Sequence, residues 1–235
     1  MTPRIETVSM DSLIVRLFDH IDERHMPWLM AAERALRQAL QEVLIDLVPS
    51  YTTLLVHIDA TRLSLAEARR RVAAALEGLA PLEQAEGRHH IIPVWYDHSV
   101  GPELGRIAER AGIDCDELIR RHSGRDYCVF ALGFAPGYGF MGLVEEALAT
   151  PRLQTPRQRV PKGSVAIAER QTAVYPMRSP GGWNLIGRTA VELFDRDSDG
   201  YSLLRPGDRV RFEAVDRDTF VTAGGDPTPL EERAS

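Results

Sequence analysis

Short β-type runs separated by glycine and proline occupy the second half of this 235-residue chain. The runs cover residues 127–132, 164–168, 172–175, 184–186, 191–194 and 208–212. Short strands with turn signals at such close intervals are typical of a β-barrel or a β-sandwich. Two stretches with helical spacing precede the runs, at residues 102–111 and 114–122. The sequence therefore predicts a barrel or sandwich domain in this half.

The first 96 residues alternate between strand-type and helical patterns. Strand-type runs cover residues 12–18, 45–48, 54–58 and 90–96, and helical spacing covers residues 27–43 and a stretch after Ser64. Ser64 and Glu67 form a capping-box pattern at the start of that second helix, and Gly78 is placed to end it. The order β-α-β-β-α-β matches the ferredoxin-like split βαβ unit.

These patterns predict an α+β protein in three parts. We expect an N-terminal ferredoxin-like α/β domain at residues 1–88, a β-barrel domain at residues 89–222 and a frayed tail at residues 223–235. The first boundary follows a polar stretch that contains Pro81 and Gly87. Such stretches are typical of linkers, and polar chain ends are typically frayed.

Composition excludes several classes of protein. The chain is 44% apolar and 26% charged, which excludes a disordered or fibrous chain. A pI near 5.7 and a net charge of −6 argue against nucleic acid as a partner, because phosphate binding needs surplus cations. Cys115 and Cys128 are the only cysteines, too few for a disulfide framework and without the spacing of a zinc site. No signal-peptide or membrane-spanning run is present, so we expect a soluble cytoplasmic protein without a metal.

Basic residues are concentrated between residues 150 and 190. Seven bases and one acid, Glu169, give this segment a net charge of +6, whereas the whole chain carries −6. The seven bases are Arg152, Arg157, Arg159, Lys162, Arg170, Arg178 and Arg188. This concentration favours a local site for an anion or for an acidic partner surface, and a solvated basic face is the alternative.

No complete catalytic motif is present in the sequence. Residues 137–142 read G-x-G-x-x-G, but no helix of normal length and no βαβ unit follows, so a dinucleotide site is not predicted. The chain also lacks a Walker A sequence, a GxSxG elbow, an HExxH helix and a CxxC pair. His122 ends a predicted helix, where a cation that stabilises the helix C-terminus is one interpretation and a catalytic group is the other.

A series of motifs in the second half carries a family resemblance. In chain order they are GFAPG at 133–137, TPR at 155–157, VPKGSV at 160–165, QT at 171–172, YP at 175–176, SPGGWNLIGR at 179–188 and LLRPGDRVRF at 203–212. With these motifs the chain resembles the KipI family, also known as the first subunit of allophanate hydrolase or the B-type subunit of 5-oxoprolinase, which corresponds to subdomains C and D of a carboxyltransferase domain. Three segments depart from the family pattern: residues 137–143, Lys162, and the pair Glu169-Arg170.

The resemblance implies both a fold and a function. The family fold is a small α/β domain followed by a cyclophilin-like β-barrel. Similar proteins form, with a second carboxyltransferase-like subunit of C type and a third subunit of A type, an ATP-dependent 5-oxoprolinase that opens 5-oxo-L-proline to L-glutamate. Inhibition of a sensor histidine kinase and a role as an allophanate hydrolase or urea carboxylase-type subunit are the alternatives. The isolated chain is expected to be inactive.

The candidate site lies in the loops and strand ends that carry the motifs. The expected catalytic residues are His122, Arg157, Gln171 and Tyr175, and the expected substrate-binding residues are Phe134, Pro136, Gly137, Ser179, Gly181, Gly182 and Trp183. An arginine fork suits a carboxylate or an ATP phosphate, and a histidine of ordinary pKa suits general acid–base chemistry. We expect the four catalytic residues and Ser179 to line one pocket with aromatic walls; barrel packing is the alternative role for Tyr175 and Trp183.

Overall fold

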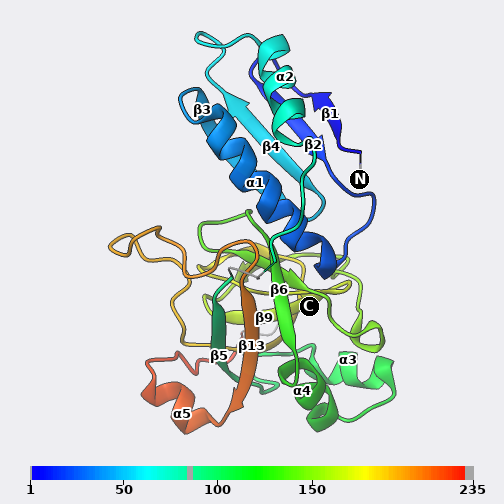
Figure 1. Ribbon diagram of the computed structural model, residues 1–235. Helices are drawn as coiled ribbons and strands as arrows, with labels where there is room; N and C mark the ends of the chain where they lie inside the picture. The colour runs from blue at the N-terminus through cyan, green and yellow to red at the C-terminus, as the bar shows by residue number, and fades with distance from the viewer. Residues whose placement is uncertain (1, 84–86, 231–235) are drawn as a thin grey trace. The chain divides into compact units, whose positions relative to one another are not determined.

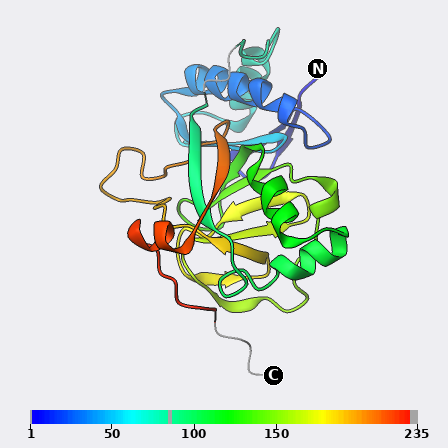
Figure 2. The ribbon, with the colours of Figure 1, turned by 90° about the horizontal axis from the view of Figure 1, so that it is seen from below.

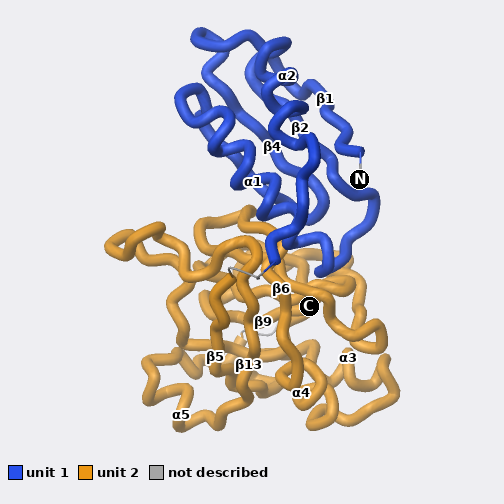
Figure 3. Tube along the Cα trace, in the orientation of Figure 1, with its two compact units in different colours: residues 1–86 blue, residues 87–235 orange. Residues whose placement is uncertain are grey.

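The computed structural model describes residues 2–83 and 87–230, and the chain divides into two compact units, residues 1–86 and 87–235 (Figure 3). The second unit includes Gly87 and Arg88, which the sequence assigns to the linker. Two hydrogen bonds hold Arg88 in the second unit: its N–H donates to the Asp208 carboxylate, and its carbonyl accepts from the Arg209 N–H.

The first unit is a four-stranded antiparallel sheet with two helices (Figure 1). Its elements are β1 (Arg4–Thr7), β2 (Ser12–Arg16), α1 (Met26–Leu40), β3 (Leu44–Ser50), β4 (Thr53–Ile58) and α2 (Leu65–Ala75), with a short 3-10 helix at Glu23–His25. The strand order is β1-β2-β4-β3. Alternate residues of β2 and β4 are buried, as the period of two along a strand requires, and α1 contacts β3 and β4.

This sheet has the strand order of the split βαβ unit, but one strand comes from a different part of the chain than the sequence predicts. The edge strand beside β2 is β1, at the N-terminus, and it pairs in antiparallel register from Arg4↔Arg16 to Thr7↔Leu13. The predicted sixth element, residues 90–96, belongs to the second unit instead. Since β1 is only four residues long and mostly exposed, it has no hydrophobic pattern that reveals it.

The second unit is a closed seven-stranded barrel, which confirms the α+β class and the barrel prediction. The order around the barrel is β10-β7-β6-β13-β5-β12-β9. These strands are β5 (His89–Trp95), β6 (Asp126–Leu132), β7 (Gly139–Gly142), β9 (Ser164–Ala168), β10 (Gln171–Val174), β12 (Asn184–Arg188) and β13 (Arg209–Val215). The parallel pair β5–β13 keeps register from His89↔Arg209 to Trp95↔Val215.

Helices lie around the barrel (Figures 1 and 2), and a small two-stranded sheet is separate from it. The helices are α3 (Leu104–Ala111), α4 (Cys115–Ser123), α5 (Arg217–Thr222) and the 3-10 turn at Glu146–Leu148. The separate two-stranded sheet pairs β8 (Arg157–Val160) with β11 (Ser179–Gly181). Helices α3 and α4 contact each other, and α5 packs against β5.

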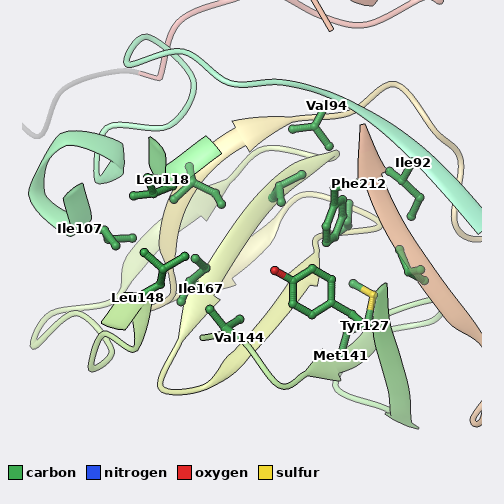
Figure 4. Close-up of a cluster of buried hydrophobic side chains, with 14 of the residues drawn as sticks. Ile92, Val94, Ile107, Leu118, Tyr127, Met141, Val144, Leu148, Ile167 and Phe212 are labelled. Atoms are coloured by element: carbon green, nitrogen blue, oxygen red, sulfur yellow. The ribbon is translucent and has the colours of Figure 1, made fainter. Parts of the chain in front are cut away.

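The wall formed by β9, β10 and β12 is buried on both faces. Val165 and Ile167 belong to the interior cluster, together with Tyr127 and Phe212 (Figure 4). The alternate residues belong to a second cluster on the opposite face, called here the outer cluster: Tyr138, Val160, Ala166, Ala168, Ala173, Tyr175, Trp183 and Leu185. Every residue of β9 is therefore buried, and its last four residues, after Ser164, form a continuous apolar run.

Two expectations differ from the structure. Residues 191–194 form no strand; only an isolated bridge joins Phe194 to Ser202. Residues 223–230 are not a frayed tail, because Arg188 donates to the carbonyls of Asp226 and Thr228 and the Leu230 N–H donates to the Ser99 carbonyl. The remaining predicted tail, residues 231–235, lies outside the described residues.

Asp208 joins the start of β5 to the turn before β13, so its replacement is expected to weaken the barrel. The buried carboxylate accepts hydrogen bonds from the Arg88 and Arg205 N–H groups, each at 2.8 Å, and from His90 Nε2 at 3.0 Å. Asp208→Ala is expected to lower the free energy of unfolding by about 3 kcal/mol, because hydrogen bonds to a buried charge are lost. Urea denaturation measures this loss.

Asp126→Ala is the matched control. Asp126 also pairs with a histidine and an arginine of the barrel, His89 and Arg211, but its side chain is 37% exposed. An exposed pair contributes less than about 1 kcal/mol. Equal losses for the two variants would contradict the role of the Asp208 network.

Candidate functional site

An aromatic cluster extends from the surface loop 133–137 into the outer cluster. Tyr138 lies at its centre, with ring centroids 5.2 Å from Phe134, 5.3 Å from Tyr175 and 5.9 Å from Trp183. Phe134 is 66% exposed and has a φ of +71°, a left-handed conformation that is uncommon for an aromatic residue. The loop therefore holds one apolar ring at the surface, directly above the buried aromatic residues.

Tyr175 contacts the glycine-rich turn of the SPGGW motif. A Cβ at Gly181 would lie 2.2 Å from the Tyr175 hydroxyl oxygen, so only glycine permits this approach. Burial raises the pKa of Tyr175, while hydrogen bonds with the Trp183 backbone and the Tyr138 side chain act in the opposite direction. Because the net pKa is above its ordinary value, the hydroxyl is protonated at neutral pH and can donate a hydrogen bond.

Arg157 lies beside this turn, since it pairs with Gly181 in the β8–β11 sheet. One of its terminal nitrogens, Nη2, donates to Glu103 Oε1 at 2.5 Å, and Glu103 Oε2 accepts from the Leu185 N–H at 2.8 Å. Both side chains are nearly buried, with exposures of 13% and 10%. The acid therefore already neutralises Arg157, and the buried Nη1 of Arg157 has no hydrogen-bond partner among the described residues.

The other predicted contacts lie in the β8–β11 sheet and the turn after it, or in the loop 133–137. Ser179 opens β11, and its hydroxyl is buried without a partner within the described part of the chain. The Gly182 carbonyl accepts from the Leu153 N–H at 2.7 Å. Pro136 is exposed, and Gly137, at φ +79°, fits against the Leu193 carbonyl, which would be 2.7 Å from a Cβ. These residues maintain the turn and loop geometry of the face.

Gln171 lies on the outer face of the wall but outside the β8–β11 sheet. It pairs with Ala168, an outer-cluster residue, so its side chain lies on the same side of the wall as Tyr175. Four residues of extended chain separate the two, which is roughly 13 Å between their Cα atoms. The structure therefore places Gln171 at the far end of β10 from the Tyr175 hydroxyl.

His122 lies on the opposite side of the wall, so the prediction that it lines the same pocket is wrong. It is fully buried at the end of α4, and its ring stacks on Phe212 with centroids 4.7 Å apart. The Thr172 hydroxyl donates to the Ala166 carbonyl, so His122 Nε2 donates to Thr172 Oγ1 at 2.9 Å. Nδ1 then accepts from the Tyr96 hydroxyl at 2.7 Å.

This environment keeps His122 neutral. Desolvation by burial lowers its pKa to about 3, and burial raises the pKa of Tyr96 well above its ordinary value. Both ring nitrogens are occupied by buried hydroxyl groups, and neither reaches solvent. His122 therefore holds α4 to the barrel interior, and the geometry does not support a role as a general acid or base.

A pocket of about 700 Å³ adjoins the outer face. Three of its lining residues are arginines, Arg106, Arg110 and Arg152, and Glu109 is the acid among them. The Arg152 guanidinium lies 5.8 Å from the Trp183 ring centroid, a cation–π geometry. Arg106 donates to the Asn184 side chain, at the end of the SPGGWN sequence. The pocket is basic and suits an anionic ligand or an acidic surface.

Sequence reasoning missed Glu103, Arg106 and Arg110, because they lie on a predicted helix that precedes the motifs. Only the i, i+4 spacing of the two arginines places them on one helix face, and that spacing is also typical of a solvated surface.

Within the described residues, no group of three or more histidine, cysteine, aspartate or glutamate side chains is arranged to hold a metal ion. No helix in that part of the chain is long and apolar enough to cross a membrane.

Comparison with known proteins identifies the family. The description "carboxyltransferase domain, subdomain C and D" matches residues 3–204. The chain belongs to this family. A protein of Bacillus subtilis (strain 168), named as the B subunit of 5-oxoprolinase, is 32% identical over 222 residues, which are 90% of this chain and 92% of that protein. One with the same name from Escherichia coli O157:H7 is 37% identical over 198 residues, 81% of this chain and 89% of that one.

Solved structures show the same fold within longer chains. The crystal structure of TTHA0988 has a TM-score of 0.77 and 37% identity, and the match covers 96% of this chain but 42% of that one. Urea carboxylase of Kluyveromyces lactis has a TM-score of 0.75 at 15% identity, over 94% of this chain and 22% of the enzyme, which is a likeness of fold alone. The chain thus spans less than half of the length of these structural neighbours.

The Arg157–Glu103 pair makes a testable prediction about stability. Arg157→Met leaves the Glu103 carboxylate buried without its cation and is expected to lower the free energy of unfolding by about 3 kcal/mol. The double variant Arg157→Met/Glu103→Gln removes both charges and is expected to recover most of this loss. Urea denaturation of the chain and both variants measures the difference; equal losses in both would contradict the pairing.

The neutral His122 predicts a pH dependence of stability. Below the ordinary histidine pKa of 6.5 the unfolded chain binds a proton that folded His122 does not bind until about pH 3. The free energy of unfolding is therefore expected to fall as the pH drops through this window, by up to about 1.4 kcal/mol per pH unit. His122→Gln lacks this contribution, so urea denaturation between pH 7 and 4.5 is expected to give it a shallower slope; identical slopes would show that His122 is charged in the folded protein.

Proposed function

We propose that this chain is a subunit of an ATP-dependent 5-oxoprolinase that opens 5-oxo-L-proline to L-glutamate only when its partner subunits are bound. The names of relatives that match along nearly their whole length support this activity. The outer face supports the need for partners, because its described residues present hydrogen-bond donors and an aromatic surface but no nucleophile–base pair. An enzyme that depends on ATP is expected in the cytoplasm.

The family description supports the same conclusion about partners. It names subdomains C and D of a carboxyltransferase domain, and in TTHA0988 the matching region is 42% of one continuous chain. We infer that a second carboxyltransferase-like subunit, of C type, corresponds to the additional part of such chains. A third subunit, of A type, completes the enzyme.

The proposed reaction adds water across the ring amide. The C–N bond breaks, the carbonyl carbon receives a hydroxyl group, the nitrogen receives a proton, and hydrolysis of ATP to ADP and phosphate drives the step. Negative charge develops on the carbonyl oxygen, which preorganised donors stabilise. The protonated Tyr175 hydroxyl beside the glycine turn is the donor of this chain that best fits that role, and the pocket of three arginines attracts the substrate anion.

Reconstitution tests the proposal. The purified chain alone is expected to form no glutamate from 5-oxoproline and to show no 5-oxoproline-dependent ATP hydrolysis. Adding the C-type and A-type subunits is expected to give both activities and a stable complex, with a buried interface of about 2,000 Å² or more. Cleavage by the isolated chain, or an inactive but fully assembled complex, would overturn the proposal.

Tyr175→Phe tests the proposed donor. The substitution removes one hydroxyl and keeps the ring, so kcat of the reconstituted enzyme is expected to fall at least about tenfold, the equivalent of one hydrogen bond. Tyr201→Phe is the matched control, because Tyr201 is 59% exposed and its ring contacts Phe194 instead of the Tyr138 cluster. Equal kcat values for the two variants would show that the Tyr175 hydroxyl takes no part in the reaction.

Carboxyl transfer is a second candidate function. The family description and the fold shared with urea carboxylase favour it. An assembled complex that turns over urea or allophanate in place of 5-oxoproline would establish it. Inhibition of a sensor histidine kinase stays a prediction from the sequence, and a deletion strain that grows normally on 5-oxoproline but loses kinase control would support that role.

A further inference from the structure

Arg188 is a buried cation on the outer face of the barrel wall. Its residue exposure is 2%, and one terminal nitrogen, Nη1, donates to the carbonyls of Asp226 and Thr228 at 2.7 and 2.8 Å. The other two nitrogens, Nε and Nη2, are buried and have no hydrogen-bond partner in the described part of the chain. Buried charges in proteins are ordinarily paired, so a guanidinium with two unsatisfied nitrogens requires an explanation.

A second unsatisfied donor lies directly opposite. Ser164 is the register partner of Arg188 in the β9–β12 ladder, which puts their Cβ atoms about 5 Å apart on one face. Ser164 is fully buried, and its hydroxyl also has no partner among the described residues. The next position across the sheet is Tyr175, whose N–H donates to the Ser164 carbonyl at 2.9 Å. Arg188 and Ser164 therefore lie in one row with the proposed donor.

The cover over this row is the C-terminal segment, residues 223–230. Its hydrogen bonds to Arg188 come from main-chain carbonyls. The Asp226 carboxylate attracts the Arg188 charge but accepts its hydrogen bond from the Thr228 N–H, at 2.9 Å. The Leu230 N–H donates to the Ser99 carbonyl, and the Leu230 side chain packs against the outer cluster. Most residues of the segment are themselves exposed, so Arg188 is one layer of chain below solvent.

We propose that Arg188 and Ser164 form a binding site for a small carboxylate. The Nε and Nη2 donors of a guanidinium form a planar fork that matches the two oxygens of a carboxylate, and the Ser164 hydroxyl supplies a third donor. The ligand enters when residues 223–230 lift from the wall. If the proposed function holds, the ligand is the carboxylate of 5-oxoproline; the assignment of the site itself does not depend on that function.

Binding to the full chain, measured by isothermal titration calorimetry, tests the site. The probes are 5-oxo-L-proline, sodium acetate and 5-oxo-L-prolinamide, which has no carboxylate. The wild-type chain is expected to bind both carboxylates and not the amide. Arg188→Lys keeps the charge but loses the fork, so about a tenfold weaker affinity is expected, and Arg188→Gln is expected to lose about a hundredfold or more.

Ser164→Ala is the decisive variant. Its hydroxyl has no partner in the described chain, so its removal is expected to leave stability unchanged or raised while carboxylate affinity falls about tenfold. Arg211→Gln, on an exposed strand position, is the control that is expected to bind as wild type does. Unchanged affinity in Ser164→Ala and Arg188→Lys, or no carboxylate binding by the wild-type chain, would overturn the site. Failure of the reconstituted enzyme to turn over 5-oxoproline would overturn only the proposed function, since acetate binding is independent of it.

Discussion

The barrel wall formed by β9, β10 and β12 is buried on both of its faces, and this constraint determines where chemistry can occur in the second unit. Side chains of a strand alternate between faces, so a shift of one residue moves a group from the interior to the outer cluster. Val165 packs inside, whereas its neighbours Ser164 and Ala166 lie outside. The helices α3 and α4 contribute side chains to the interior cluster. The β8–β11 sheet and the C-terminal segment, residues 223–230, lie on the outer side.

The polar residues on the two faces of the wall have different roles. In the interior, the Tyr96 hydroxyl, His122, the Thr172 hydroxyl and the Ala166 carbonyl form a chain of hydrogen bonds, and a satisfied buried network fixes a unique packing arrangement. On the outer face, several donors have no acceptor in the part of the chain that the structure describes, and they lie beside an aromatic cluster that reaches the surface at Phe134. The interior network therefore contributes stability, whereas the outer face has bonding capacity left for another molecule.

The sequence predicts the class of the fold well, because short runs such as 164–168 combine β-branched residues with turn residues at their ends, here Gly163 before the run and Glu169-Arg170 after it. The predicted β-α-β-β-α-β pattern of the first unit includes residues 90–96, although they form a strand of the second. A strand that ends one domain has the same pattern as a strand that begins the next, and only the parallel pairing with β13 shows which domain it belongs to. The site is less predictable for the same reason. Motif spacing places Tyr175 and Gly181 near each other, but it cannot tell that His122 enters the barrel from α4 or that Glu103 neutralises Arg157.

The unsatisfied groups also indicate what must complete this face. Within the described residues, the buried side-chain atoms without partners are all donors or hydroxyl groups, and five of the six belong to Arg157, Ser164, Ser179 and Arg188 around the outer face. A ligand without acceptor atoms would leave these donors unpaired, at a cost of about 1–3 kcal/mol for each group. Oxyanions and acceptor-rich surfaces remove that cost, and a carboxylate on a small substrate or on a partner subunit provides two acceptors in one plane. The outer face is therefore suited to a negatively charged group. This agrees with the surplus of arginine between residues 150 and 190 of an otherwise acidic chain.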